Sequence, residues 1–217
     1  MHEVDVVLPC LDEAAALPGV IGALPPGYRA IVVDNGSRDG SPEVAASLGA
    51  TVVHESRRGY GAAVHTGLEN AKSDVVCFMD ADGSLDPGEL PRLITPILAG
   101  KAELSVGRRV PVTRDSWPWH ARAGNAVLAR LLRKRGLAVR DIAPIRAVRR
   151  EDLLALGVTD RAFGYPLELL IRAAEAGWRV LETDVAYRPR TAGTKSKVSG
   201  SVRGTLRAVH DMAGVLR

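Results

Sequence analysis

Apolar and polar positions follow a regular order in the first half of the chain. Short apolar runs rich in β-branched residues predict strands at residues 4–8, 30–33, 51–53, 75–79 and 104–106. Stretches with helical spacing separate them, at residues 13–24, 42–48, 61–71 and 87–99. Unbroken apolar strands that alternate with helices are typical of a parallel sheet covered on both faces. The pattern therefore predicts an α/β fold with a mainly parallel sheet flanked by helices.

Two helix starts are marked by Ser41-Pro42 and Asp86-Pro87, because Ser and Asp cap helices and proline is favoured in the first turn. The second half of the chain is less regular and shows no internal repeat. It predicts helices at residues 121–135 and 166–176 and a strand at residues 180–187. Residues 191–201 are rich in Gly, Ser, Thr and Lys, so we expect a flexible loop there.

Polar residues gather directly after the predicted strands. They occupy residues 9–13, 34–39, 55–61, 80–84 and 108–109. Ligands of open α/β sheets bind in the crevice outside the carboxyl ends of the strands. The sequence therefore predicts a nucleotide and metal site at this edge of the sheet.

The metal would be held by Asp80 and Asp82, which follow the fourth predicted strand. Successive strand residues point to opposite faces, so these two carboxylates should point the same way. Such a pair suits Mg²⁺ or Mn²⁺, which take oxygen ligands and share them with a diphosphate. An ordinary turn is the alternative, since Asp and Gly are common turn residues.

The charge of the chain is unevenly distributed. Over 217 residues, of which 46% are hydrophobic, the net charge is +4, but residues 108–150 hold twelve Lys or Arg and only two acids. This segment should face an anion. Aromatic residues make up 4% of the chain and are not interleaved with the basic ones, so phosphate on a small substrate or lipid fits better than nucleic acid.

The cysteines and the chain ends bear on location. Cys10 and Cys77 lie in apolar runs, as buried thiols do in a reducing cytoplasm. We see no leader and no apolar stretch long enough to span a membrane, so we expect a soluble cytoplasmic protein. From residue 198, apolar residues three or four apart predict an amphipathic basic helix that contacts the inner face of the membrane peripherally. Packing of that stripe on the protein's own sheet is the alternative.

Three motifs, at residues 8–13, 33–41 and 80–82, together resemble the family 2 glycosyltransferases of the GT-A fold. Within that family the chain looks most like the dolichol-phosphate mannose synthase and polyprenyl-phosphate glycosyltransferase group. The resemblance implies a metal-dependent, inverting enzyme that uses a nucleoside-diphosphate sugar. Residues 1–110 would then form the nucleotide-sugar-binding half, and residues 111–217 the acceptor-binding half, of one domain.

The resemblance also implies roles on the donor side. Pro9 and Glu13 would border the nucleoside, and Asp34 would contact the base or ribose. The segment Arg58-Gly59, with the backbone amides of the helix start that follows, would approach the nucleotide, although an ordinary glycine-rich loop is the alternative. The donor and metal residues would thus be Pro9, Glu13, Asp34, Arg58, Gly59, Asp80, Ala81, Asp82 and Lys195. Ser84 stands where several relatives have a metal-binding Gln, which leaves a third protein ligand open.

Three later segments resemble acceptor-side features of the family. Residues 163–170 resemble the helix that carries an acid, here Glu168. Residues 190–197 resemble an Arg-x-x-Gly-x-Ser-Lys loop enlarged by one residue, which leaves open whether Lys195 or Lys197 contacts the diphosphate. Residues 141–146 resemble an Asp-x-x-x-x-Arg stretch, but residues 143–145 read Ala-Pro-Ile instead of the usual Ser/Thr-Gly-Phe, so we expect a different local backbone.

The acceptor decides which catalytic groups are needed. A phosphate acceptor, whose second pKa is near about 6, is anionic at neutral pH and needs cations to position it. The candidates are Arg108, Arg109, Arg122 and Arg146. A hydroxyl acceptor would instead need a base, either Glu168 or Asp141. The basic segment favours a phosphate acceptor, and the resemblance implies that this acceptor is polyprenyl phosphate. Asp82, with Arg190 or Lys195, would act on the leaving diphosphate. A nucleotide-sugar-binding protein without turnover is the alternative from another class.

Overall fold

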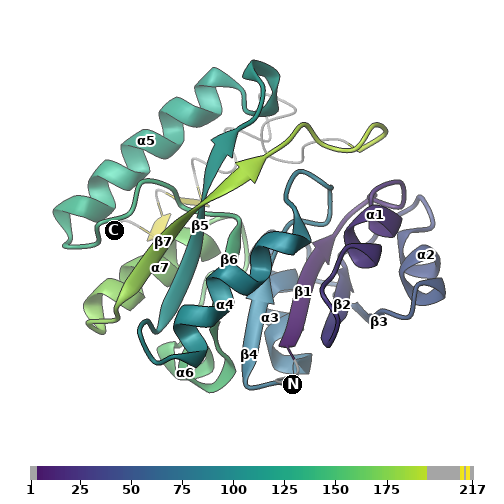
Figure 1. Cartoon of the computed structure of the whole chain (residues 1–217), viewed down its shortest axis with the longest axis horizontal. Helices are drawn as coiled ribbons and strands as arrows, with labels where there is room; N and C mark the ends of the chain where they lie inside the picture. The colour runs from purple at the N-terminus through teal and green to yellow at the C-terminus, as the bar shows by residue number, and fades with distance from the viewer. Residues whose placement is uncertain (1–3, 195–210, 213, 216–217) are drawn as a thin grey trace.

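The computed structural model describes residues 4–194, 211–212 and 214–215. Its seven strands form one sheet in the order β3-β2-β1-β4-β6-β5-β7 (Figure 1). The strands are β1 (Val4–Cys10), β2 (Tyr28–Asp34), β3 (Thr51–His54), β4 (Val75–Phe78), β5 (Leu104–Pro111), β6 (Ile145–Arg149) and β7 (Val180–Tyr187). The helices are α1 (Leu17–Gly22), α2 (Ser41–Ser47), α3 (Tyr60–Asn70), α4 (Leu90–Leu98), α5 (Trp119–Lys134), α6 (Arg150–Leu156) and α7 (Tyr165–Glu175), with short 3-10 turns η1 (Pro87–Glu89) and η2 (Arg114–Ser116).

Strands β1 to β4 run parallel, which confirms the prediction from the apolar runs. β1 lies between β2 and β4, with Val6 opposite Ala30 on one side and Cys77 on the other. The central strands β1 and β4 are almost wholly buried, because helices cover both sides of the sheet, whereas the edge strand β3 is partly exposed. Their carboxyl ends meet at one edge, where the polar residues gather.

The strand β6 was not predicted. It runs antiparallel between β4 and β5, with Arg146 opposite Phe78 and Val106. Arginines at two of its five positions interrupt the apolar pattern, so the sequence did not signal a strand there. Because β6 runs in reverse, its first residues lie at the edge where β4 ends.

Helices cover both faces of the sheet. Leu17 of α1 and Leu93 of α4 belong to one buried apolar cluster. Leu68 of α3 and Leu170 of α7 belong to a second cluster on the other face. The sheet is therefore the middle of three layers, and loops at its edge are held from both sides.

The two predicted helix starts differ in outcome. Asp86 accepts a hydrogen bond from the N–H of Gly88 (2.9 Å) at the start of η1, which confirms that cap. The Ser41 cap is wrong, because Gly40 holds the cap position with φ +83° and Ser41 is the first helical residue. The Ser41 hydroxyl instead accepts a hydrogen bond from the N–H of Glu13 (2.9 Å). It ties the loop after β1 to the start of α2.

Two expectations about the C-terminal part of the chain fall mostly on residues 195–210. One is the loop that carries Lys195 and Lys197, and the other is the amphipathic helix from residue 198. Residues 195–210 lie outside the described residues. Among the described residues, no helix has the length and apolar character that crossing a membrane requires.

Candidate active site

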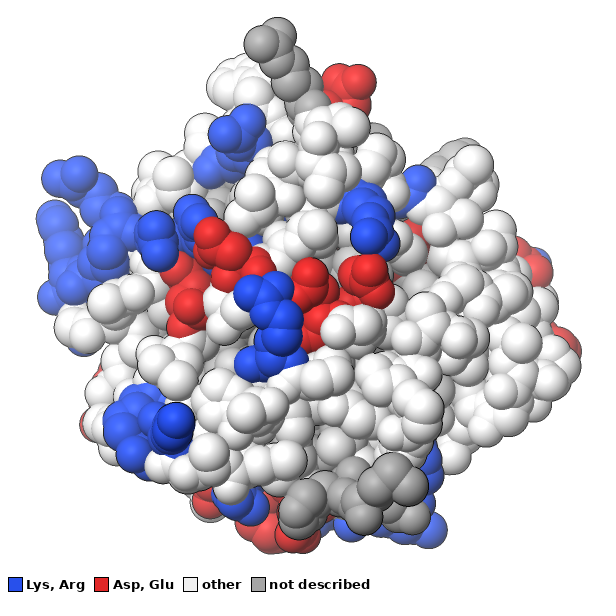
Figure 2. Space-filling view, viewed as in Figure 1, with Lys and Arg blue, Asp and Glu red and all other residues white. Residues whose placement is uncertain are grey.

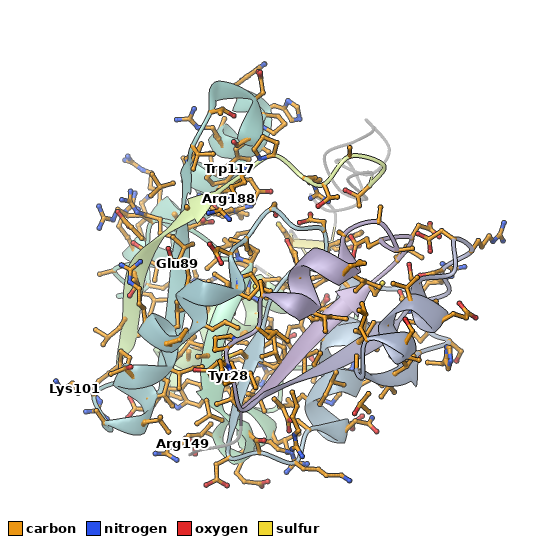
Figure 3. All side chains as sticks on the ribbon, turned by 45° about the vertical axis from the view of Figure 1, so that its right-hand side comes forward. Tyr28, Glu89, Lys101, Trp117, Arg149 and Arg188 are labelled. Atoms are coloured by element: carbon orange, nitrogen blue, oxygen red, sulfur yellow. The ribbon has the colours of Figure 1, made fainter. Side chains whose placement is uncertain are left out.

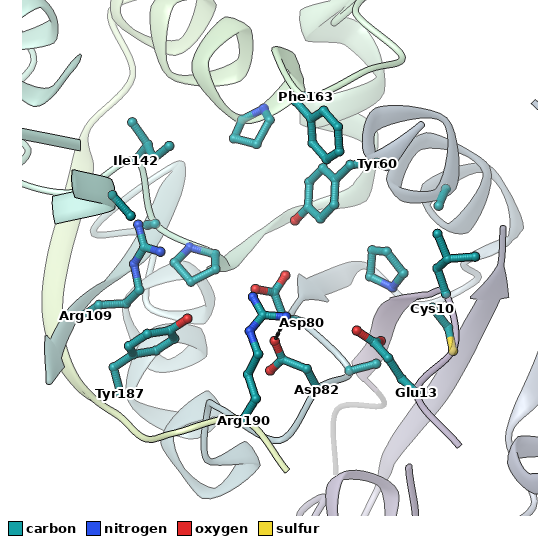
Figure 4. A pocket seen from close by; sticks show the side chains of 18 of the residues that line it. Cys10, Glu13, Tyr60, Asp80, Asp82, Arg109, Ile142, Phe163, Tyr187 and Arg190 are labelled. Carbon is teal, nitrogen blue, oxygen red and sulfur yellow. Dashed lines mark ion pairs between the residues drawn. The ribbon is translucent and has the colours of Figure 1, made fainter. Parts of the chain in front are cut away.

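A pocket of about 1240 Å³ opens at the edge of the sheet where β1, β2 and β4 end. Its walls come from the loops after these strands, from the residues before β6 and from the end of β7. In Figure 4, Asp80 and Asp82 lie between Glu13 on one side and Arg109 and Tyr187 on the other. The pocket therefore joins the predicted donor side to the predicted acceptor side.

The carboxylates of Asp80 and Asp82 both line this pocket. β4 ends at Phe78, so the turn after the strand, rather than strand alternation, brings the two side chains together. Asp82 is 1% exposed and accepts a hydrogen bond from the N–H of Ser84 (2.9 Å). Burial, followed by the negative charge of Asp82, raises the pKa of Asp80 to about 6. Two buried carboxylates that repel each other are stabilised by a neighbouring cation.

Arg190 supplies positive charge to this pair. Its guanidinium lies 2.6 Å from a carboxylate oxygen of Asp82. The backbone holds the contact, because the N–H of Thr191 donates to the carbonyl of Asp82 (3.0 Å) and that of Arg188 to the carbonyl of Ser84 (2.9 Å). The segment after β7 thus runs along the loop that carries the aspartates.

On the predicted donor side, Pro9, Glu13 and Ala81 line the pocket. Asp34 does not. Its carboxylate accepts hydrogen bonds from the N–H groups of Gly36 (3.2 Å) and Ser37 (2.9 Å) and is engaged with the turn after β2.

The next residue, Asn35, lines the pocket in its place. Its side-chain amide donates to the carbonyls of Glu55 (2.9 Å) and Arg57 (2.8 Å) and accepts from the N–H of Gly59 (2.9 Å). Arg58 in turn donates to the carbonyl of Asn35 (2.9 Å). One buried amide therefore positions the whole basic glycine loop.

Several of the backbone amides at the start of α3 are engaged within the protein. The N–H of Gly61 donates to the carbonyl of Ala162 (2.9 Å), and that of Ala62 to the carbonyl of Arg161 (2.8 Å). With the N–H of Gly59 bound to Asn35, these amides are already used within the protein. The side chain of Arg58 lines the pocket, and so does the start of the helix at Gly59, Tyr60 and Ala63.

The predicted acceptor side of the pocket is built around Arg109. Its guanidinium donates twice to Asp141 (2.9 and 2.7 Å) and lies 3.9 Å from the ring centroid of Trp117 and 5.5 Å from that of Tyr187. Burial alone would raise the pKa of Asp141, but the hydrogen bonds and charge of Arg109 hold it below the usual value. Asp141 is fully buried and does not line the pocket, so it positions Arg109.

Arg146 is the second arginine on this side. It is 1% exposed, and its guanidinium donates a hydrogen bond to the carbonyl of Ile142 (2.7 Å). Its buried Nε has no hydrogen-bond partner in the described part of the chain. The hydroxyl of Tyr60 points into the pocket toward Asp80 (Figure 4), and burial raises its pKa to about 12.

Three predicted site residues lie elsewhere. Arg108 pairs with Asp184, and Arg122 is exposed on α5; neither lines the pocket. Glu168 also lies outside it. It accepts hydrogen bonds from the backbone of residues 159 and 160 and from the guanidinium of Arg172 (2.6 Å), which stabilise the start of α7.

The aspartate pair fits a divalent cation. The raised pKa of Asp80 reflects its burial and its repulsion by the negative charge of Asp82, and the contact between Asp82 and Arg190 shows that a cation is accommodated there. No third His, Cys, Asp or Glu completes a metal cluster within the described residues. The remaining ligands would therefore come from a diphosphate or water.

Comparison with known proteins adds a family. The chain matches the profile described as glycosyl transferase family 2 over residues 2–157. An uncharacterized glycosyltransferase of Mycobacterium tuberculosis is 56% identical, with 98% of this chain and 97% of the relative covered. The polyprenol monophosphomannose synthase of Mycolicibacterium smegmatis is 34% identical, with 90% and 81% covered.

A solved structure shares the fold. The glucosyl-3-phosphoglycerate synthase of Mycobacterium tuberculosis, in complex with Mn²⁺, UDP and glucosyl-3-phosphoglycerate, aligns with a TM-score of 0.76 at 22% identity. The alignment covers 99% of this chain and 80% of that one. The three layers and the sheet edge described above are therefore common to both proteins.

Proposed function

This chain belongs to glycosyl transferase family 2, and we propose that it is a metal-dependent, inverting enzyme that transfers a sugar from a nucleoside-diphosphate sugar to polyprenyl phosphate. The family assignment makes it a glycosyltransferase of the GT-A fold. The identities of the donor, the metal and the acceptor are what we propose. The named polyprenol relative supports a lipid phosphate, and the aligned structure with UDP and Mn²⁺ supports the donor and the cofactor.

On the donor side, Asp80 and Asp82 would hold Mg²⁺ or Mn²⁺, which when bound offsets negative charge on the diphosphate. Glu13 and Pro9 border the space for the nucleoside, and Arg58 faces it. Arg190 stands where charge develops on the leaving group. An acceptor phosphate oxygen forms the new bond to the anomeric carbon, and the departing nucleoside diphosphate takes the electron pair of the bond that breaks.

The side chain of Arg146 is the main observation that supports a phosphate acceptor. The Nε of this buried guanidinium has no hydrogen-bond partner among the described residues, and the guanidinium acts on Asp80 only through its charge, without an ion pair between them in the described part of the chain. A buried cation in this state is costly unless an anion binds it. Around it, the pocket is lined by apolar side chains, among them Trp117, Ile142 and Phe163. A cation within an apolar wall matches a phosphate attached to a hydrocarbon chain.

A hydroxyl acceptor is less well supported because its two candidate bases are engaged. Asp141 is buried behind Arg109, and Glu168 lies outside the pocket. Asp115, at the exposed rim, is a remaining pocket carboxylate on this side. Direct attack by an ionised phosphate needs none of them.

The test is a transfer assay with Mn²⁺ and UDP-, GDP- or TDP-sugars, selected first by thermal shift because a bound ligand stabilises the native state. A short isoprenyl phosphate, the matching isoprenol and 3-phosphoglycerate serve as acceptors. We expect product with the isoprenyl phosphate alone. Asp82→Ala should abolish transfer and leave the fold intact, and Arg146→Gln should raise the acceptor KM by about 30-fold or more, as loss of a charged hydrogen bond does.

Product with isoprenol or 3-phosphoglycerate but none with the isoprenyl phosphate would overturn the proposed acceptor. Full turnover by Asp82→Ala at saturating Mn²⁺ would overturn the metal assignment.

A further inference from the structure

Helix α5 presents apolar side chains to solvent. Among the large apolar residues that the structure describes as exposed, the three most exposed are Trp119 (79%), Val127 (60%) and Val112 (52%). Trp119 and Val127 belong to α5, and Val112 lies shortly before it. Single exposed apolar residues are ordinary, but a cluster on one element indicates a contact surface.

The same helix carries only positive charge. Within α5 there are Arg122, Arg130, Arg133 and Lys134 and no acid. In the described part of the chain no acidic side chain pairs with Arg122, Arg130 or Lys134. Figure 2 shows Lys and Arg gathered at the left edge, where the C-terminal end of α5 lies in Figure 1. The outer side of α5 thus combines an exposed tryptophan with unpaired cations.

This surface adjoins the acceptor side of the pocket. Trp117, Pro118 and Ala121, at the start of α5, line the pocket wall. An apolar chain leaving the pocket past these residues would emerge beside Trp119. Figure 3 shows Trp117 in the upper part of the molecule and Lys101 far from it, at the lower left.

We propose that the outer face of α5, defined by Trp119, Val127, Arg130 and Lys134, docks on an anionic bilayer and brings the pocket mouth to the membrane surface. Tryptophan is favoured at the membrane–water interface, and basic residues are attracted to anionic headgroups. The charged side chains of α5 are all positive, so the helix is electrostatically complementary to an anionic bilayer. The inference rests on the proposed function only for the identity of the lipid acceptor. It differs from the sequence-based expectation of contact through residues after 198.

The experiment is flotation of the full chain with vesicles of phosphatidylcholine, with and without 30% phosphatidylglycerol, at low and physiological salt, without any substrate. We expect binding to the anionic vesicles that weakens with salt. The double variant Arg130→Gln/Lys134→Gln should bind about 30-fold more weakly, which corresponds to about 1 kcal/mol per cation. Trp119→Ser should bind about 5-fold or more weakly.

Matched controls are Lys72→Gln/Lys101→Gln, two exposed cations away from α5, and Leu48→Ser, an exposed apolar residue of 39%. They should bind as the native chain does. Equal losses in test and control variants, or equal binding to neutral and anionic vesicles, would overturn the α5 surface, as would unchanged binding of the α5 variants.

Transfer to a water-soluble isoprenyl phosphate separates this inference from the proposed function. The α5 variants should retain that activity and lose transfer to a long-chain acceptor embedded in anionic vesicles. If the chain floats as expected but transfers to no phosphate acceptor, the proposed function fails and the docking surface stands. Loss of activity on the soluble acceptor in the α5 variants would contradict a purely docking role.

Discussion

The guanidinium of Arg190 lies 2.6 Å from a carboxylate oxygen of Asp82, and the same aspartate is a proposed metal ligand. Arg190 and a divalent cation compete for that carboxylate. In the absence of nucleotide, Arg190→Gln should therefore bind Mn²⁺ about 3- to 10-fold more tightly than the native chain. Transfer should fall by about 100-fold or more, because the leaving diphosphate loses a cation. Electron paramagnetic resonance of free Mn²⁺ measures the binding.

The control for that variant is Arg188→Gln on the same segment, since Arg188 pairs with Asp86 (3.1 Å) and does not line the pocket. Its Mn²⁺ affinity should match the native value. Weaker Mn²⁺ binding by Arg190→Gln would mean that Arg190 assists the metal rather than competing with it.

Asp80→Asn should stabilise the metal-free protein while removing activity. The folded-state pKa of Asp80 is about 6 against an ordinary value of 3.8, so the folded protein binds this proton more tightly than the unfolded chain does. Ionisation of Asp80 therefore lowers the free energy of unfolding above pH 6. This loss disappears as the pH falls from 6 to below 4, because the carboxylate becomes protonated. At pH 8 the variant should be more stable by on the order of 2 kcal/mol, with a gap that narrows toward pH 4.

Urea unfolding with EDTA at several pH values measures this gap. Asp115→Asn, at an exposed carboxylate, should change stability by no more than about 0.5 kcal/mol at any of them. An Asp80→Asn variant that is less stable than the native chain at pH 8 would show that the carboxylate is not strained.

Asn35→Asp should damage the donor side although the two side chains have the same shape. A carboxylate cannot donate to the carbonyls of Glu55 and Arg57, so both would face an anion. We expect a loss of about 2 to 4 kcal/mol in unfolding free energy and a donor KM raised by about 10-fold or more, with the acceptor KM little changed. Asn70→Asp, at an exposed amide with one helix contact, is the matched control.

Glu168→Gln should affect stability rather than chemistry. The carboxylate binds the backbone N–H groups of Thr159 and Asp160 and the guanidinium of Arg172. Burial would raise its pKa, but these hydrogen bonds hold the pKa below the usual value, so the native group is charged. We expect a loss of about 1 to 3 kcal/mol in unfolding free energy and kcat/KM within about 3-fold. A fall in kcat of about 100-fold with a lost basic limb in the pH profile would instead identify a general base.

The fold and the aspartate pair could be predicted because their signals are local in the sequence. An apolar run followed by Asp80 and Asp82 identifies a buried strand and its ligand end. The strand β6 could not be predicted, since Arg146 is buried by contacts with elements distant in sequence. Ala143, in the turn before that strand, has a positive φ of 50°, which is uncommon for a residue other than glycine.

In the basic segment, residues 108–150, the sequence also does not show which individual arginines face the pocket. Arg108 and Arg109 are neighbours on β5, and consecutive residues point to opposite faces. The sequence does not say which face holds the pocket. The structure pairs Arg108 with Asp184 on the outside and Arg109 with buried Asp141 on the inside. Asn35 was missed for a related reason, since its partners lie 20 to 24 residues away.

The reversed strand β6 has a consequence for how such a chain can diversify. Phe78 of β4 and Arg146 of β6 are register partners, and neighbouring strands are about 4.8 Å apart. The spacing between Asp80 and Asp82, the proposed metal ligands, and Arg146, the proposed acceptor residue, is therefore fixed by a hydrogen-bonded ladder and not by a hinge. Residues between the end of β5 and the start of β6 line the pocket and, on the proposed function, would shape the space for the body of the acceptor. Replacing that segment would then exchange one acceptor for another while the reacting atoms keep the same separation.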